Sequence, residues 1–217
     1  MMEIIASKKS IDLLIFSEIS SETYYNKFLI HPVVPAGDSG ITIGAGYDCG
    51  QMTKDLIISD WHEYLSIENL KLLITTAGLK GEKAKAILPS VKKISVSFED
   101  GCKVFYKRSL PKYAKMTFNL YPGLDKLAPD AIGALISMIY NRGAATTGTN
   151  REEIKSIIHL VPPKDYAGIA ALVLHSKRIW ENKKGMEGIL TRRTTEANLI
   201  ANAVHQYNQE DLITINI

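Results

Sequence analysis

Residues 37–48 read GDSGITIGAGYD, and this glycine-rich stretch carries the strongest structural signal in the chain. From its fifth position onward, apolar residues alternate with small or polar ones, and a period of two predicts a β-strand. The residues on one face of that strand are Thr42, Gly44, Gly46 and Asp48. This face has a hydroxyl at one end, a carboxylate at the other and almost no side chain between them. Such a bare face suits the close approach of a flat, polar ligand.

A short amphipathic helix is expected just upstream, over residues 10–18, with Ser10 as its N-cap. Its apolar stripe follows the i, i+3, i+4, i+7 spacing of one helix face and consists of Ile11, Leu14, Ile15 and Glu18. A carboxylate at the end of such a stripe is partly buried, and burial tends to raise its pKa. The periodicity equally allows Glu18 to point to water. Two carboxylates beside a glycine-floored strand are the groups that cleavage of a glycosidic bond requires.

The remainder of the chain is expected to be mostly helical, with one small sheet near the N-terminus. Helical patterns cover residues 53–62, 66–76, 82–88, 97–118, 129–140, 149–159, 165–176 and 188–206. Capping boxes open two of these helices, at Ser97 and Thr149. Pro111 is expected to kink or split the helix in which it lies. Residues 129–140 are the most apolar, so they are expected to form a central, buried helix.

Length and composition exclude several classes of protein. The chain has 217 residues, 46% of them hydrophobic, which suits one domain with a real core. A net charge of +3 is too small to indicate nucleic-acid binding. No apolar run is long enough for a transmembrane helix, so a membrane is not an expected partner. The histidines are too dispersed for a metal site, and no cofactor is expected. Cys49 and Cys102 read as free thiols, although a disulfide between them stays open.

Three motifs, in this order along the chain, resemble those of the phage-type lysozymes. Glu18, then Tyr25 seven positions later, then a Thr-Ile-Gly-x-Gly strand that begins at Thr42 match the first motif. Residues 134–143, ALISMIYNRG, are similar to the family's central helix, which ends in Asn-x-Gly. Residues 188–197, GILTRRTTEA, are similar to its Gly-Leu-x-x-Arg-Arg-x-x-Glu segment. The resemblance implies an α+β, predominantly helical, lysozyme-like fold in which a small N-terminal β-hairpin lobe packs on a helical lobe.

The position of the second carboxylate distinguishes two branches of that family. The common branch has an aspartate two residues after the tyrosine, where this chain has Lys27. The pesticin-like branch has the aspartate six residues after the threonine, and Asp48 stands at that spacing from Thr42. The resemblance therefore implies that Glu18, Thr42 and Asp48 are the catalytic residues.

Two other carboxylates are weaker candidates for the site. Asp38 lies in the turn before the strand, where an aspartate commonly bonds its own backbone. Glu22 is too close to Tyr25 in the sequence to fit the motif. The residues that the resemblance implies as contacts to substrate are Tyr25, Gly44, Gly46, Tyr47, Asn141 and Arg142. For Arg142, an interhelical ion pair with Glu196 or Glu152 is the favoured alternative.

The reaction implied by the resemblance is hydrolysis of the β-1,4 bond between N-acetylmuramic acid and N-acetylglucosamine in bacterial peptidoglycan. Glu18 would protonate the leaving oxygen, Asp48 would stay ionised, and Thr42 would hold a water. In a straight strand Thr42 and Asp48 would lie about 20 Å apart at 3.3 Å per residue. The strand therefore has to turn around Gly44 and Gly46 if both side chains are to reach one sugar.

One catalytic domain with a short extension is the expected organisation. The expected divisions are an N-terminal extension (1–9) and a lysozyme-like domain (10–217) made of a catalytic helix and β lobe (10–50), a helical insert (51–120) and a C-terminal helical lobe (121–217). The N-terminus does not resemble a signal peptide, so we expect synthesis in the cytoplasm. Action in the periplasm or cell wall would then follow injection by a secretion system or release on lysis.

Two biological settings fit this expectation equally. The protein would be an antibacterial toxin or secreted effector, with a cognate immunity protein as partner, or a phage endolysin. A catalytically inactive peptidoglycan-binding module on the same fold is the main alternative. A helical interaction protein without a link to the cell wall is the third reading, and it leaves the glycine-rich strand unexplained.

Overall fold

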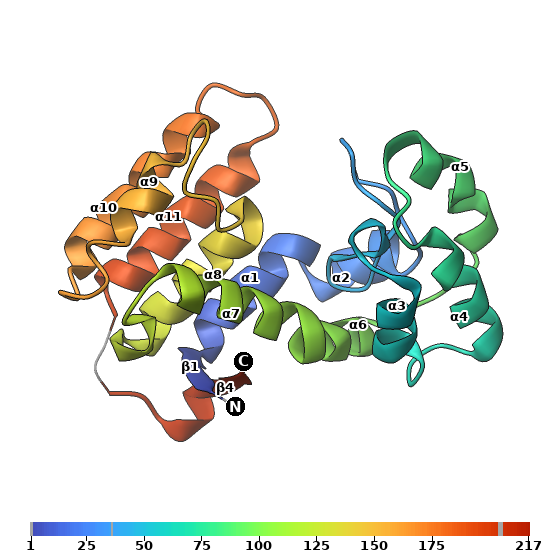
Figure 1. Ribbon diagram of the computed structural model, residues 1–217, viewed down its shortest axis with the longest axis horizontal. Helices are drawn as coiled ribbons and strands as arrows, with labels where there is room; N and C mark the ends of the chain where they lie inside the picture. The colour runs from blue at the N-terminus through green and yellow to red at the C-terminus, as the bar shows by residue number, and fades with distance from the viewer. Residues whose placement is uncertain (1, 36, 204–205) are drawn as a thin grey trace. The chain divides into compact units, whose positions relative to one another are not determined.

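The computed structural model describes residues 2–35, 37–203 and 206–217. It is a predominantly helical α+β protein, as the sequence predicts, but the described ranges contain two small two-stranded sheets where the sequence predicts one. The chain divides into two compact units. Unit 1 contains residues 1–17 and 111–217, and unit 2 contains residues 18–110. The boundaries differ from the expected divisions, because the first helix starts in unit 1 and the β-hairpin groups with the helices that follow it (Figure 1).

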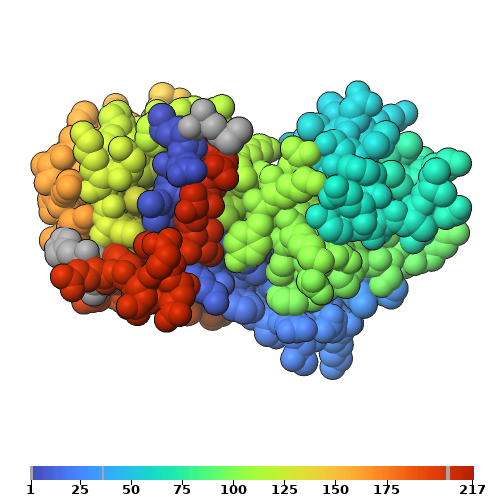
Figure 2. All heavy atoms as spheres, turned by 90° about the horizontal axis from the view of Figure 1, so that it is seen from below, coloured from blue at the N-terminus to red at the C-terminus, as the bar shows by residue number. Residues whose placement is uncertain are grey.

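The sheet of unit 1 joins the two ends of the chain. Strand β1, Glu3–Ser7, pairs antiparallel with β4, Leu212–Asn216, so that Ile4 lies opposite Ile215. Figure 2 shows the two strands side by side, β1 in blue and β4 in red. The segment that the sequence analysis sets apart as an extension, residues 1–9, thus contains this strand and the start of a helix. Pairing between segments so far apart leaves no local signal in the sequence.

Helix α1, Lys8–Ile19, begins two residues earlier than the sequence predicts. Ser7, not Ser10, lies at its start, and the Ser7 hydroxyl oxygen accepts a hydrogen bond from the Ser10 backbone N–H at 3.3 Å. The Ser10 hydroxyl donates to the Ser7 carbonyl at 2.7 Å. Ser10 is fully buried against Gly133, where an added Cβ would lie 1.8 Å from its Oγ. Gly133 therefore has to be glycine for α1 to pack here.

The central helix of unit 1 is α8, Pro129–Arg142, as predicted. Leu135, Ile136 and Ile139 have no exposed surface. The helices that complete this unit are α7 (Leu110–Leu120), α9 (Glu152–Ile157), α10 (Tyr166–His175) and α11 (Glu187–Ala201). Helix α8 packs against α11 and β1. Helix α11 ends before the predicted limit of 206, and residues 204–205 of that prediction lie outside the described ranges.

The helices of unit 2 are short. They are α2 (Glu22–Tyr24), α3 (Lys54–Trp61), α4 (Ile67–Leu73), α5 (Gly81–Val91) and α6 (Phe98–Val104). π-Helical turns follow α2 at Tyr25–Leu29 and α6 at Phe105–Ser109. Single 3₁₀ turns occur at Cys49–Gln51, Ile74–Thr76, Leu124–Lys126, Ser176–Ile179 and Gln209–Asp211, the last three in unit 1. In the part of the chain that the structure describes, no helix has the length and apolar character needed to cross a membrane.

Candidate functional site

The glycine-rich stretch forms a tight β-hairpin in unit 2. Strand β2, Thr42–Ile43, pairs antiparallel with β3, Tyr47–Asp48, and Thr42 lies directly opposite Asp48. Between the strands, Gly44 and Gly46 have φ values of 57° and 78°, which only glycine adopts without strain. The chain thus reverses direction around Gly44 and Gly46, as the sequence analysis requires if Thr42 and Asp48 are to lie close together. Directly opposed residues have Cβ atoms about 4.5–5.5 Å apart, so the long separation in a straight strand does not apply.

The two faces of the hairpin differ as the period of two predicts. Ile43 and Tyr47 face inward and are buried, and the Tyr47 ring meets Trp61 edge to face with centroids 5.4 Å apart. These residues belong to the hydrophobic core of unit 2. Thr42 and Asp48 face the other way and are half-buried. The hydroxyl and the carboxylate that the sequence predicts on one face are therefore neighbours on that face.

Asp48 is held in place by backbone groups. Its Oδ1 accepts hydrogen bonds from the N–H of Gly40 at 3.1 Å and from the N–H of Gly50 at 2.8 Å. Neither glycine has room for a side chain, since a Cβ on Gly40 would lie 2.4 Å from Asp48 Oδ1. Asp48 also caps the 3₁₀ turn Cys49–Gln51. The periodicity of the strand does not reveal the part that Gly40 and Gly50 play here, and the only local signal for it is a glycine two residues after an aspartate.

Thr42 is fixed through its backbone. Its N–H donates to the Val33 carbonyl at 2.8 Å, and its own carbonyl accepts from the Val33 N–H at 3.0 Å. Strand β2 therefore lies between β3 and the extended residue Val33. The Thr42 hydroxyl donates to the Gly40 carbonyl at 3.4 Å, which is a long hydrogen bond. A bond this weak leaves the hydroxyl able to exchange it for a ligand.

Glu18 occupies the last turn of α1 and is the first residue of unit 2. The stripe that precedes it is buried as predicted, with Leu14 at 0% and Ile15 at 4% exposure, and Glu18 itself is half-buried. Beyond Glu18 the chain turns sharply, because Ser20 has a φ of 62° and Ser21 caps α2. The carboxylate thus stands at the end of a helix that is anchored on its apolar side.

Tyr25 is part of the core and cannot contact a substrate, which corrects the prediction for this residue. Its side chain is fully buried, and its hydroxyl donates to the Val96 carbonyl at 3.0 Å. Its ring meets Phe98 edge to face with centroids 5.6 Å apart. The Tyr25 hydroxyl also touches Gly101, which packs against Gly44 of the hairpin turn. The Tyr25 side chain therefore fastens the segment that follows α1, by way of Gly101, to the turn of the hairpin.

Two further predicted contacts on the hairpin are also structural. Tyr47 is buried, and its hydroxyl donates to Asp60 Oδ2 at 2.9 Å. Burial, reinforced by this hydrogen bond, raises the pKa of the Tyr47 phenol. Gly44 is buried beneath Trp61, which an added Cβ would approach to 2.9 Å. Gly46 is half-buried in the turn and stays a predicted contact.

The remaining predicted contacts belong to unit 1. Arg142 is buried, with its Nη1 3.5 Å from Glu153 Oε2 and its guanidinium 5.7 Å from the centre of the Trp180 ring. Burial lowers the pKa of the Arg142 guanidinium. Arg142 does form an interhelical ion pair, but its partner is Glu153 and not the expected Glu152 or Glu196, and the side chain has little surface left for a substrate. Asn141 is exposed near the end of α8 and stays a prediction.

The rival carboxylates occupy surface positions. Asp38 is exposed, and its Oδ1 would lie 3.0 Å from a Cβ on Gly81, the first residue of α5. A carboxylate at this end of a helix is stabilised by the helix dipole. Glu22 is exposed in the first turn of α2. Lys27 is exposed too, with its ammonium 5.1 Å from the centre of the Phe28 ring.

Comparisons with known proteins give one match of undetermined function. A family model described as "Domain of unknown function (DUF8812)" matches residues 14–117, a range that contains all of unit 2. No curated protein matches the chain.

Cys49 and Cys102 are free, as predicted. Within the described ranges, no group of three or more histidine, cysteine, aspartate or glutamate side chains is arranged to hold a metal ion.

Proposed function

We propose that this protein is a peptidoglycan hydrolase of the N-acetylmuramidase type, with a lysozyme-like fold. It would cleave the β-1,4 bond between N-acetylmuramic acid and N-acetylglucosamine. The observation that carries the proposal is the pairing of Thr42 with Asp48 across the hairpin, in the same unit that begins with Glu18. A hydroxyl beside a carboxylate, with a second carboxylate elsewhere in the unit, is the set of groups that hydrolysis of a glycoside needs.

Each of the three residues has a distinct part in the proposed reaction. Glu18 donates a proton to the glycosidic oxygen as the bond to the anomeric carbon breaks. Asp48 stabilises the positive charge that develops on the sugar ring or orients the attacking water. Thr42 holds that water through its hydroxyl. Water attack on the face opposite the leaving group inverts the anomeric centre and requires carboxylates roughly 6.5–9.5 Å apart.

The biological role that we propose is attack on bacterial cell walls. The protein would act in the periplasm or cell wall as an antibacterial toxin or secreted effector, or as a phage endolysin. In the toxin setting an immunity protein would cover the site in the producing cell. Both settings use the same reaction and the same residues.

A catalytically inactive peptidoglycan-binding module remains the second candidate, and one observation favours it. Asp48 already accepts two backbone hydrogen bonds through Oδ1, so its presence has a structural explanation that needs no chemistry. A binder and an enzyme on this fold differ in whether the carboxylates turn over substrate. Measurement of products separates them.

The decisive experiment is mass spectrometry of the fragments released from purified peptidoglycan. Wild-type protein is expected to release muropeptides with a free N-acetylmuramic acid end. Glu18→Gln keeps the shape of the side chain and is expected to lower the rate about 10²–10⁴-fold, the usual contribution of general acid catalysis. Glu22→Gln is the matched control, since Glu22 is an exposed glutamate of the next helix. Near-normal rates in Glu18→Gln would refute the assignment of the acid.

A further inference from the structure

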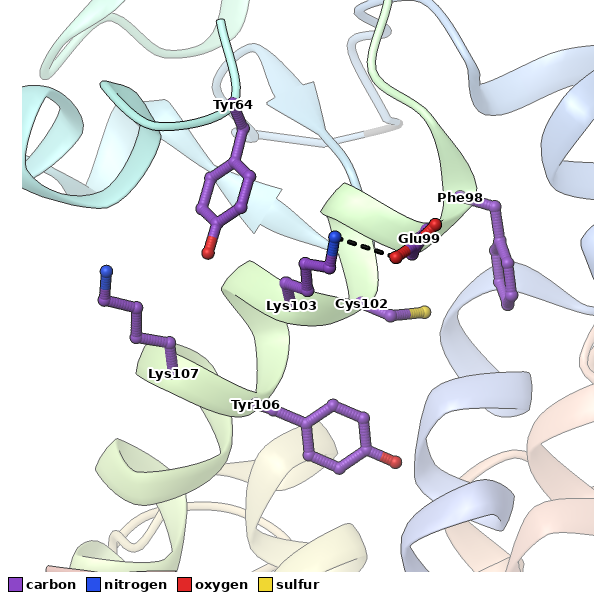
Figure 3. Close-up of a pocket in the computed structure, with 7 residues that line it drawn as sticks. All are labelled: Tyr64, Phe98, Glu99, Cys102, Lys103, Tyr106 and Lys107. Carbon is purple, nitrogen blue, oxygen red and sulfur yellow. Dashed lines mark ion pairs between the residues drawn. The ribbon is translucent and has the colours of Figure 1, made fainter.

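Unit 2 contains a pocket of about 630 Å³ that involves neither Glu18 nor the hairpin. Three of its lining residues follow one another at a spacing of four along α6 and the π-helical turn after it: Phe98, Cys102 and Tyr106. A second row, Glu99, Lys103 and Lys107, runs beside the first. Figure 3 shows Tyr64 approaching this second row from another segment, with its hydroxyl toward the lysines. Pockets that hold small ligands have volumes of about 300–1,000 Å³.

The aromatic side chains of the pocket are positioned by the core behind them. Phe98 is fixed by its edge-to-face contact with the buried Tyr25 ring. Tyr106 is 37% exposed, and its ring contacts that of the buried residue Phe105 at 5.6 Å between centroids. These rings therefore present apolar surface without having to be ordered by a ligand. Binding to preformed aromatic surface costs little conformational entropy.

The charged side chains of the pocket are balanced. The Lys103 ammonium lies 2.8 Å from Glu99 and 3.4 Å from Asp100, and the Lys107 ammonium lies 2.9 Å from Glu63. These two cations thus face three carboxylates. A phosphate or other strongly anionic ligand would have to displace those carboxylates. Exposed ion pairs are weak, however, so their ammonium and carboxylate groups can turn toward hydroxyl or amide groups of a neutral ligand.

We propose that this pocket binds a neutral, N-acetylated saccharide, as a second contact for a glycan strand. A sugar ring has an apolar C–H face that stacks on an aromatic ring and hydroxyl groups around its edge that bond to polar side chains. Tyr64 and Tyr106 offer both an aromatic face and a hydroxyl. The choice of an N-acetylated sugar rests on the proposed function, whereas the choice of a neutral saccharide rests on the lining of the pocket.

Calorimetric titration with the tetramer of N-acetylglucosamine tests this proposal. The Glu18→Gln protein is used as the background, so that the sugar is not consumed during the titration. Tyr106→Ala in this background is expected to weaken binding about two- to tenfold, the range for loss of one aromatic contact. Tyr106→Phe is expected to retain most of the affinity, because the ring is kept. Ile67→Ala is the matched control, since Ile67 is a 64% exposed apolar residue of α4 outside the pocket.

The possible outcomes distinguish a failure of the proposed saccharide site from a failure of the proposed catalytic residues. Equal affinities in Tyr106→Ala and Ile67→Ala, or no binding by the background protein, would overturn the saccharide site whatever the protein hydrolyses. Selective loss of binding in Tyr106→Ala supports the site even if peptidoglycan is not cleaved. Full hydrolytic activity in Glu18→Gln would refute the proposed acid and leave the pocket result standing.

Discussion

The carboxylate of Asp48 has a structural task in addition to its proposed part in chemistry. Its Oδ1 accepts hydrogen bonds from the N–H groups of Gly40 and Gly50 and so links the hairpin to the segments before and after it. Loss of activity in a variant that also lost this support would say nothing about the reaction. The side chain chosen as replacement therefore has to keep an acceptor at Oδ1.

Asp48→Asn and Asp48→Ala are expected to separate the two tasks. Asparagine keeps an oxygen at Oδ1, so the free energy of unfolding of Asp48→Asn should stay within about 1 kcal/mol of the wild-type value. Its hydrolysis of peptidoglycan should be lost. Asp48→Ala leaves two backbone donors unpaired and should lose about 1–3 kcal/mol in urea denaturation. An active Asp48→Asn protein would exclude Asp48 from the reaction. Asp38→Asn, at the exposed turn, serves as the control and is expected to be mild.

The two cysteines are expected to differ in reactivity, because the thiolate is the form that reacts. Burial raises the pKa of the Cys49 thiol to about 12, so at pH 8 this residue should stay unlabelled by a disulfide reagent until the protein unfolds. Cys102 is half-buried in the lining of the pocket of unit 2, and burial, with a smaller effect of the Glu22 charge, raises the pKa of its thiol. Slow labelling of Cys102 alone is expected, and Cys102→Ser should abolish it. Equal labelling of both thiols in native protein would contradict this prediction.

At the scale of single residues, the sequence predicts the direction of a side chain better than its role. The period of two correctly places Thr42 and Asp48 on one face, because that pattern follows from strand geometry. It does not distinguish a tyrosine that contacts ligand from one that serves the core. Tyr25 and Tyr47 became core residues because Val96 and Asp60 offer buried acceptors to their hydroxyls. Those acceptors are distant in sequence, so no local pattern reveals them.

Among the helices, two glycines provide a matched pair of substitutions. Gly101 of α6 touches the hairpin turn, and an added Cβ would lie 3.0 Å from Gly44 Cα and 3.1 Å from the Tyr25 hydroxyl. Neither neighbour can yield easily, so Gly101→Ala is expected to cost about 1–3 kcal/mol through overpacking. Gly188 of α11 has nothing within 4 Å of that position, and Gly188→Ala should stabilise by about 0.5–1 kcal/mol. Thermal denaturation measures both changes, and a stable Gly101→Ala protein would show that the hairpin does not pack here.

Local sequence rules succeeded for elements in which the local residues decide the outcome. The hydroxyl of Ser97 caps α6 by accepting from the Asp100 N–H at 3.0 Å, as predicted.

The predicted capping box at Thr149 is wrong, because Asn150 adopts a φ of 61° and α9 begins only at Glu152 without a side-chain cap. Pro111 does not split its helix. The π-helical turn just before it widens the helix, and the Leu110 N–H bonds to the Phe105 carbonyl five residues back.

For the whole molecule, the two units differ in how the chain closes them. Unit 2 is one continuous stretch with its own core around the hairpin and Trp61. Unit 1 consists of two stretches from opposite ends of the chain, joined by the β1–β4 ladder. Composition and periodicity predict the helical class of such a fold. They do not predict a discontinuous unit, because the contacts that close it lie between residues about as far apart in sequence as the chain allows.

Closure of unit 1 by its terminal strands leads to a prediction about Ile215. This residue of β4 is 3% exposed and lies opposite Ile4 of β1, which is 1% exposed, on the inner face of the ladder. Ile215→Ala is expected to cost about 2–5 kcal/mol, because the cavity removes contacts from both strands. Ile5→Ala is the matched control, since Ile5 is 45% exposed on the outer face and should change stability by no more than about 0.5 kcal/mol. Hydrogen exchange should show faster exchange of the β1, β4 and α8 amides in Ile215→Ala, because β1 packs against α8. Wild-type protection of α8 in this variant would mean that the terminal sheet frays without opening the core of unit 1.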